Sequence, residues 1–299
     1  MDYGMRSIGV IAKRRRFEKP VEVLLLVCAL VTVLLVGLIT ILIFSEGLPI
    51  FQAQGLLSFL FGGKWAPTAS PPLYGIWPMI VTSLTVTLLA LVIALPVGLA
   101  CAIFLAEIAP QRPARVLRRA VDVLAGIPSV VYGFFGITMI VPLIRDIFGV
   151  NGQSVLAGGI ILAVMILPTL ISISEAGIRS VPRAYKEGSL AMGASHWQTI
   201  HRVMLPAARN TIVTSVVLAL GRALGETMAI ILVMGNTPAM PASLLDPART
   251  LTVNIVMEMS YVTPGTEHYA ALFGTGVVLF VFIMVLNIVV NRLIHRTVK

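Results

Sequence analysis

The chain has 299 residues, of which 58% are hydrophobic and only 12% are charged, and its mean hydropathy is +0.96. A soluble domain is about half apolar and about one quarter charged, so this composition excludes an ordinary soluble protein and predicts an integral membrane protein. In a soluble chain, the formal net charge of +9 would indicate a protein that binds nucleic acid. Here the charge lies in tails and loops beside apolar runs, so we expect a lipid bilayer and no nucleic acid as a partner.

The first 75 residues combine a basic tail, an apolar run and a loop. Residues 1–22 hold a cluster of arginines and lysines, and the apolar run Val23–Phe44 follows. This run is longer than a signal-peptide core and no small-residue cleavage site follows it, which predicts a retained first span. Residues 45–75 are rich in Gly and Pro and are expected to complete the segment 23–75 as an outer loop.

The segment 76–292 is predicted to form the main transmembrane domain, with a short tail at 293–299. It holds five further apolar runs, each long enough for a spanning helix, which needs roughly 20 residues. Pro96 is expected to interrupt the first of them, and Pro168 lies within the third. The runs are Ile76–Leu105, Val121–Ile144, Val155–Ile173, Thr211–Gly235 and Ala270–Val290, with an outer loop at 236–269. The fold class is therefore an all-α integral membrane protein with six transmembrane helices.

The distribution of basic residues predicts the orientation of these spans. Lys64, Arg145 and Arg249 are assigned to the outer side, and Arg222 lies inside a span. Every other lysine and arginine falls in a segment on the opposite side. The positive-inside rule then places both termini in the cytoplasm, together with the polar loop at about 175–210.

A proline and closely spaced glycines occur in the apolar run Val121–Ile144, at Ile127–Gly136. The residues of interest are Pro128, Ser129, Tyr132 and Gly133. At membrane depth such residues are tolerated only where neighbouring groups satisfy the backbone. The pattern indicates either a broken or tightly packed helix that lines the interior of the bundle or a simple packing kink.

The loop at about 175–210 contains the longest polar stretch, from Lys186 to Pro206. Its central glycine and final proline predict a short helix, a turn and a second short helix. In the second helix an apolar side is expected from the helical spacing of its large residues. These are Trp197, Ile200, Val203 and Met204. The elbow is either a docking surface for another protein or an amphipathic connector that rests on lipid headgroups.

Two ionisable residues, Arg222 and Glu226, lie in the run predicted as the fifth span. A spacing of four residues places both on one face of a continuous helix. Charged groups within a membrane are costly and are functional candidates, although an Arg–Glu pair can also serve packing alone. Gly221 and Gly225 favour a functional role, because they allow a helix or a solute to approach closely. A guanidinium suits an anion such as phosphate.

The sequence offers no sign of catalysis by this chain. It contains no G-x-x-x-x-G-K-[ST] loop, no Ser-His-Asp constellation and no metal-binding spacing. Cys28 and Cys101 lie in apolar runs and are expected to be small buried hydrophobes. We therefore expect no catalytic residue, no metal and no cofactor held by the chain.

The elbow resembles the EAA loop of the permeases of ABC importers. Glu187, Gly193 and Leu205-Pro206 keep the spacing of that loop, while Gly188 and Ser189 replace its two alanines. The resemblance implies a type I ABC importer permease fold, in which Glu187, Gly193, Trp197, Leu205 and Pro206 belong to the loop that contacts a cytoplasmic ATPase.

Two further motifs resemble the phosphate-specific permeases of the Pst system. They are Gly221-Arg222-Ala223-Leu224-Gly225-Glu226-Thr227-Met228-Ala229 and Ala125-Gly126-Ile127-Pro128-Ser129-Val130-Val131-Tyr132-Gly133. The resemblance is closer to PstC-like than to PstA-like subunits. It implies half of a phosphate pathway in the bacterial cytoplasmic membrane, with Arg222 and Glu226 in that pathway. The implied partners are a PstA-like permease subunit, two copies of a PstB-like ATPase that uses ATP, and an external PstS-like phosphate-binding protein.

Two other functions remain open on the residues alone. One is an ABC permease for another oxyanion, such as sulfate or molybdate. The other is an ion-coupled carrier or a channel, but a carrier often has related halves with paired broken helices, and the sequence contains no such repeat.

Overall fold

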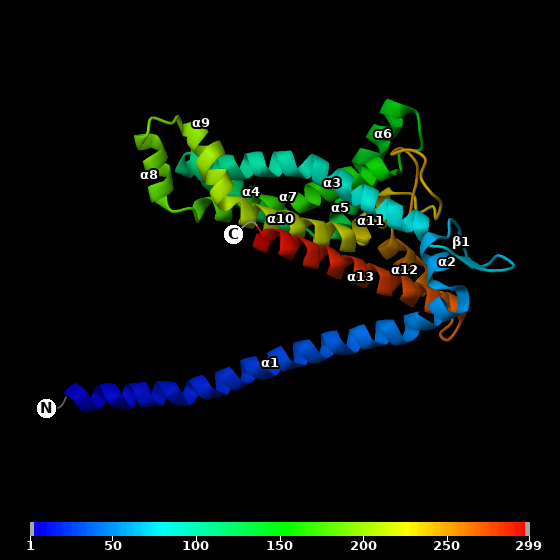
Figure 1. Cartoon of the computed structure of the whole chain (residues 1–299), viewed down its shortest axis with the longest axis horizontal. Coiled ribbons are helices and arrows are strands. Elements are labelled where there is room, and N and C mark those ends of the chain that lie inside the picture. The colour runs from blue at the N-terminus through cyan, green and yellow to red at the C-terminus, as the bar shows by residue number, and fades with distance from the viewer. Residues whose placement is uncertain (1–2, 297–299) are drawn as a thin grey trace.

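Helix α7 (Val155–Arg179) lies at the centre of a helical bundle (Figure 1). The computed structural model describes residues 3–296, and most of them are helical. In this part of the chain six helical segments are long and apolar enough to cross a membrane, which agrees with the six predicted spans. They are Lys19–Gln54, Trp77–Ile108, Ser129–Phe148, Val155–Arg179, His196–Gly225 and Glu267–Ile288. The elements in chain order are α1 (Tyr3–Gln54), α2 (Leu56–Phe61), β1 (Trp65–Ala66), β2 (Leu73–Tyr74), α3 (Trp77–Ile103), η1 (Phe104–Ile108), α4 (Gln111–Gly126), α5 (Ser129–Phe135), η2 (Gly136–Ile140), α6 (Val141–Phe148), α7, α8 (Arg183–Ala191), α9 (His196–Thr199), η3 (Ile200–Met204), α10 (Leu205–Gly225), α11 (Met228–Val233), α12 (Leu251–Met259) and α13 (Glu267–Arg296).

The main core forms where α7 packs against α3 and α10. Ile161 and Leu170 of α7 are almost fully buried, together with Ala90 of α3 and Ala219 of α10. Helices in lipid associate through close van der Waals packing, and small residues at the contact allow their backbones to approach. The alanines on α3 and α10 therefore explain why α7 is enclosed on both sides.

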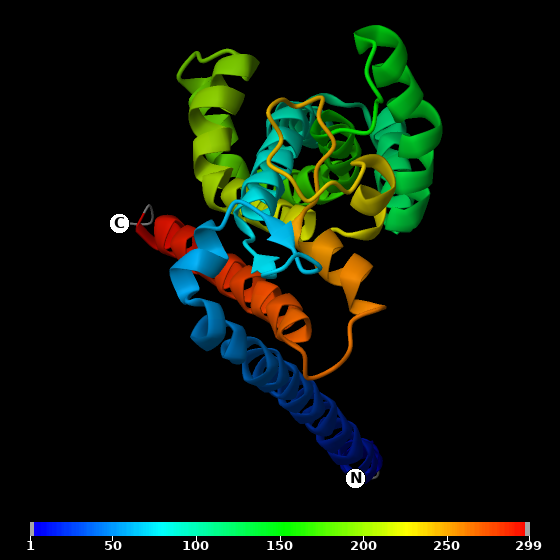
Figure 2. The same ribbon diagram turned by 90° about the vertical axis from the view of Figure 1, so that its right-hand side faces the viewer.

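The end of the bundle away from the elbow carries a second core around a short hairpin. Strands β1 and β2 pair antiparallel, with Trp65 opposite Tyr74. Phe59 of α2 and Ile50 of α1 are buried beside them. Here α1 crosses α13, and from this crossing the two helices diverge (Figures 1 and 2). Most side chains at 19–42 of α1 are exposed, and in a membrane they face lipid or another chain.

The first span continues further than its sequence predicted. Gly47 and Pro49 lie inside α1, which ends only at Gln54. Gly47 permits a close helix crossing, because a Cβ there would lie 2.8 Å from the carbonyl carbon of Phe273 and 2.9 Å from the nitrogen of Gly274. The glycine that predicted a loop is thus required for packing.

The second and third spans also differ from the prediction. Pro96 does not interrupt the second span, since α3 runs through it to Ile103, and Pro168 lies within continuous α7. The third span begins at Ser129 instead of Val121, because Gln111–Gly126 forms the separate amphipathic helix α4. The predicted helix break at Pro128 is therefore present, but it precedes the span.

The fifth span ends earlier than predicted. Helix α10 stops at Gly225, two residues are non-helical, and α11 follows at Met228. The predicted outer loop 236–269 contains α12. Cys28 is exposed on α1 and Cys101 is only half-buried, so the expectation that both cysteines are buried is wrong for Cys28 and only partly met by Cys101.

Candidate functional site

The predicted elbow is present, with α8 and α9 joined by a tight turn. Gly193 has φ = 84°, a left-handed conformation that glycine adopts without strain. Ser195 caps α9, since its Oγ accepts a hydrogen bond from the backbone N–H of Gln198, whose side chain accepts one from the N–H of Ser195. This capping box fixes where the second helix begins.

The sequence predicted a short second helix in the elbow, but in the structure this helix is long. Helix α9 continues through the π-helical turn η3 into α10, so one helical segment runs from His196 to Gly225. Pro206 lies in the first turn of α10 and does not end it. At about 1.5 Å per residue, this 30-residue segment is about 45 Å long.

Apolar side chains of the elbow face in two directions. Ile200 and Met204 are buried against Ala102 and Ile178 of the bundle. Trp197 is 62% exposed, so the single apolar side predicted for this helix is divided. Other large exposed apolar residues of the elbow were not singled out from the sequence. They are Tyr185, Leu190 and Met192.

The remaining predicted elbow residues have separate positions. Glu187, Gly193 and Pro206 are exposed, whereas Leu205 is half-buried against the inner core that also holds Met204. An exposed apolar patch outside the bilayer marks an interaction surface. The contact with an ATPase that the sequence implies for these residues stays a prediction.

A buried carboxylate connects the elbow to the second span. Lys186 Nζ of α8 lies 2.6 Å from Glu107 Oε2 of η1, and His196 Nε2 lies 3.9 Å from the same oxygen. The Glu107 side chain is only 8% exposed. Because a buried charge needs a partner, this ion pair holds α8 against the end of the second span.

Arg222 and Glu226 do not form the predicted helical pair. Arg222 lies in the last turn of α10, far from the elbow, and Glu226 follows the helix with extended backbone angles (φ −72°, ψ 134°). Arg222 Nη1 donates to Thr169 Oγ1 of α7 over 3.5 Å. Glu226 Oε1 instead accepts from the backbone N–H of Ala229 over 3.0 Å. Within residues 3–296 no ion pair joins the two side chains.

The two motifs that are distant in sequence nevertheless meet at Ala229. A Cβ on Gly133 would lie 2.9 Å from the Cα of Ala229, so α5 and α11 are in close contact. Tyr132 is buried, and its hydroxyl donates to the carbonyl of Leu124 over 2.7 Å, across the break at Pro128. Ser129 begins α5. Tyr132 and Gly133 therefore have packing roles, and a role in lining a pathway stays a prediction for all four residues of that motif.

A polar cluster at the hairpin end was missed from the sequence. Glu258 of α12 accepts from Trp65 Nε1 and from Arg249 Nη1, the latter over 2.7 Å, and His268 Nε2 lies 2.7 Å from its other oxygen. Glu258 and Arg249 are 7% and 11% exposed. This cluster fixes the hairpin to α12 and α13.

Six spans and an exposed helical elbow define the class of multi-pass membrane permeases. The chain belongs to the family of binding-protein-dependent transport system inner membrane components, whose profile matches residues 94–299. It is 42% identical to the probable ABC transporter permease protein YqgH of Bacillus subtilis, over 98% of this chain and 97% of that protein. It is 34% identical to the phosphate transport system permease protein PstC of Mesorhizobium japonicum, over 90% of this chain and 87% of that protein.

Solved structures show the same fold. A chain of a bacterial alginate ABC transporter, in complex with its pentasaccharide-bound periplasmic protein, matches with a TM-score of 0.60 at 19% identity, over 90% of this chain and 95% of that one. The inward-facing MetNI methionine ABC transporter matches with a TM-score of 0.57 at 21% identity, over 75% of this chain and 95% of that one. The predicted all-α fold of an ABC importer permease is confirmed.

Proposed function

We propose that this chain is a permease subunit of an ATP-driven importer and that it forms half of the translocation pathway for inorganic phosphate. The observation that supports phosphate as the substrate is the 34% identity to PstC of Mesorhizobium japonicum over most of both chains. PstC of Haemophilus influenzae is equally similar, at 34% identity over 88% of each chain. The relative YqgH, although 42% identical, is named only as a probable permease.

The chemistry of Arg222 supports an anionic substrate. It is an exposed arginine at the end of α10, beside the non-helical residues Glu226 and Thr227. Irregular backbone at membrane depth is tolerated where it is enclosed by protein or lines a water-filled path. A guanidinium binds phosphate oxygens in pairs, so an arginine at such a break suits a phosphate path. Glu226 serves this site by holding the first turn of α11 in place.

The proposal includes the partners that the family resemblance implied. They are a PstA-like permease subunit, two PstB-like ATPase subunits that use ATP, and an external PstS-like phosphate-binding protein. Both termini and the elbow lie on the cytoplasmic side, following the positive-inside distribution. The chain itself binds no cofactor and catalyses no reaction.

The continuous helix from the elbow to the break provides a mechanism for coupling. A displacement of α9 by the ATPase would be carried along one rigid helix of about 45 Å to Arg222. The Glu107–Lys186 ion pair would carry it to α3 by a second route. A rigid connection of this kind relates two sites without any flexible segment between them.

Phosphate uptake in a strain that lacks this gene tests the proposed function. The intact gene should restore uptake of labelled phosphate, and excess sulfate or molybdate should not compete. Competition by sulfate or molybdate would instead identify another oxyanion. Failure of any ATPase subunit to copurify with the chain would favour a carrier or a channel.

A further inference from the structure

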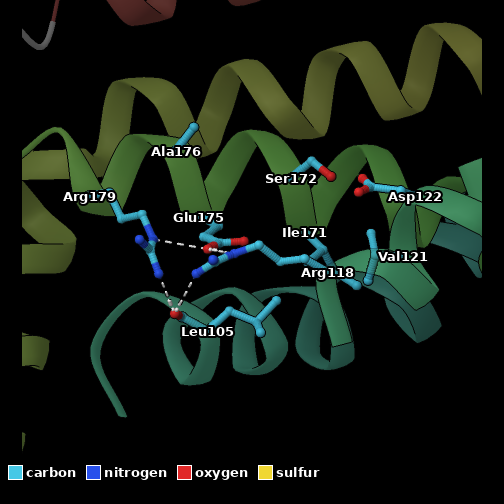
Figure 3. Close-up of a pocket in the computed structure, with 9 residues that line it drawn as sticks. All are labelled: Leu105, Arg118, Val121, Asp122, Ile171, Ser172, Glu175, Ala176 and Arg179. Carbon is cyan, nitrogen blue, oxygen red and sulfur yellow. Dashed lines mark hydrogen bonds and ion pairs between the residues drawn. The ribbon is translucent and has the colours of Figure 1, made fainter. Parts of the chain in front are cut away.

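Two arginines at the elbow end of the bundle share the same acceptors (Figure 3). Arg118 of α4 and Arg179 of α7 place their Nε atoms 2.6 Å and 2.9 Å from Glu175 Oε1. Both also donate from Nη2 to the carbonyl oxygen of Leu105, over 3.4 Å and 2.8 Å. Two like charges are thus held side by side by one carboxylate and one carbonyl, which leaves an excess of positive charge.

The geometry leaves donors of both arginines available. Each guanidinium uses Nε and Nη2 on the protein, and neither Nη1 has an acceptor in the part of the chain whose side chains the structure describes. Arg118 is 37% exposed and Arg179 is 47% exposed, so a ligand can reach them. Glu175 is only 9% exposed, and its role is to fix the two guanidinium groups in position.

A cavity of about 340 Å³ opens beside these groups. A second cavity of about 270 Å³ shares Arg118 and Arg179 with it and adds Arg115 to the lining. Asp122 lies at the far end of the first cavity, away from the guanidinium groups (Figure 3). The two cavities together are therefore lined by three arginines, with Glu175 beside the guanidinium groups of Arg118 and Arg179 and Asp122 at the far end.

The surroundings of the cavities suit an amphiphile. Leu105, Val121 and Ile171 give the first cavity an apolar wall. Val116 and Val123, each 66% exposed, are exposed apolar side chains on the same helix, α4. Basic pockets between membrane helices on the cytoplasmic side recognise anionic lipid headgroups, and arginine pairs recognise phosphoryl oxygens.

We propose that Arg115, Arg118 and Arg179 bind a phosphoryl group at the elbow end of the protein. The group belongs to an anionic phospholipid or to a free phosphate ion. The site is distinct from Arg222, which lies at the other end of α10. Because Leu105 lies in η1 with Glu107, a ligand here also contacts the segment that holds α8.

Native mass spectrometry of the full-length chain, purified with the subunits that accompany it, tests the site. Phosphatidylglycerol is the lipid probe and phosphatidylcholine its neutral control. Arg115→Gln should weaken retention of phosphatidylglycerol about tenfold, the effect of one charge-assisted hydrogen bond. Arg112→Gln, the same change in an exposed residue of α4 outside both cavities, should alter it less than about twofold. Equal losses in both variants would show only a general charge effect and overturn the proposal.

A second pair of measurements identifies the source of the group. Glu175→Gln removes the neighbouring negative charge but keeps an oxygen that can accept from Arg118 and Arg179, so retention should strengthen, whereas the loss of a merely structural contact would weaken it. Inorganic phosphate is then compared with chloride at constant ionic strength by thermal unfolding of the chain and its Arg115→Gln variant. Stabilisation by phosphate but not by phosphatidylglycerol assigns the site to the free ion. If phosphate does not stabilise the chain and phosphatidylglycerol is not retained, the proposal is wrong.

Discussion

Helices α7 and α1 are both apolar enough to cross a membrane, yet α7 is enclosed by other helices and much of α1 is exposed. In the most apolar stretch of α7, 61% of the residues are buried, whereas the corresponding share in α1 is 0%. Figure 2 shows α1 reaching well beyond the rest of the bundle. Hydropathy therefore predicts that both helices insert, but it does not distinguish the central helix from the peripheral one.

Small and polar residues distinguish the enclosed helix α7 from the exposed helix α1. Gly159 and Gly177 of α7 face side chains so closely that a Cβ would lie 2.5 Å from Leu89 Cδ2 and 2.6 Å from Thr211 Cβ. The central stretch of α1 has only Gly37, with no atom within 4 Å of a Cβ there. Lipid tails are as apolar as leucine, so apolar surface alone does not drive helices together. Close packing and polar partners do.

The largest expected effect comes from detaching α1 at its one anchored end. Glu258→Ala removes the only carboxylate paired with the nearly buried Arg249 among the described residues and also removes the acceptor of Trp65, at an expected local loss of about 3–5 kcal/mol. Hydrogen exchange should then rise in the hairpin around β1 and β2 and in the end of α1, while α7 stays protected. Glu267→Ala, which changes an exposed residue, is the control. Equal protection of the hairpin in both variants would remove the anchoring role.

A matched pair of glycine substitutions tests the comparison directly. Gly177→Leu in α7 should lower the free energy of unfolding by about 3 kcal/mol, because Thr211 leaves no room for the side chain. Gly37→Leu in α1 should be neutral within about 0.5 kcal/mol. Thermal unfolding of the two variants in mild detergent measures the difference. If Gly37→Leu destabilises the chain as much, α1 is packed where the structure leaves it exposed.

The number of spans and the position of the elbow could be predicted from the sequence because their signals are local. Run length, helical spacing and the turn at Gly193 need no knowledge of distant residues. Helix ends were predicted less well, because glycine and proline also serve packing. Gly47 marks a helix crossing, and Pro96 lies inside a continuous helix.

The candidate site was only partly predictable. The prediction that Arg222 and Glu226 form a pair assumed an unbroken helix. The chain leaves α10 after Gly225, and the Glu226 side chain accepts from the N–H of Ala229 in the first turn of α11. Three buried carboxylates were missed, and each has at least one partner that is distant in sequence. Lys186 lies 79 residues from Glu107, Arg118 lies 57 residues from Glu175, and Trp65 lies 193 residues from Glu258. An acidic residue near an apolar run, which needs a partner in the membrane, was the available signal.

A substitution at Gly193 in the elbow should have a smaller effect on stability but a large effect on transport. At Gly193 no atom lies within 4 Å of an added Cβ, as at Gly37, but the positive φ adds about 1–2 kcal/mol of strain. Gly193→Trp should uncouple ATP hydrolysis from phosphate transport by obstructing the ATPase contact. Gly193→Ala carries the same strain without the bulk and should remain more active. Normal transport by an assembled Gly193→Trp complex would exclude the elbow as the contact.

Replacement of Arg222 tests the break at the end of α10. Arg222→Met should lower phosphate uptake per assembled complex about tenfold, the loss of one charge-assisted contact, and Arg222→Lys less. Glu226→Gln keeps an oxygen that can accept from Ala229 and should have little effect. The double variant should resemble Arg222→Met alone, because the two side chains are not paired. A fully active double variant would remove both residues from the pathway.

The smallest effect is expected in the loop that caps the start of α7. The backbone N–H groups of Ser243 and Ala242 hold the pKa of Asp246 below its ordinary value of 3.8. This contribution is present above that value and is lost as the pH falls through the lowered pKa. Asp246→Asn removes the carboxylate at neutral pH, so amide exchange at Ala242 and Ser243 should accelerate. Exposed Asp146→Asn is the control, and unchanged exchange in Asp246→Asn would contradict the assignment.

ATP-dependent phosphate accumulation in vesicles is the most direct test of the proposed permease function. The purified complex is reconstituted with its ATPase, and the phosphate-binding protein is supplied on the side opposite the elbow. Labelled phosphate should accumulate only when ATP is available to the ATPase, with no response to an imposed proton or sodium gradient. Accumulation driven by such a gradient in the absence of ATP would contradict the assignment of this chain as an ABC importer permease.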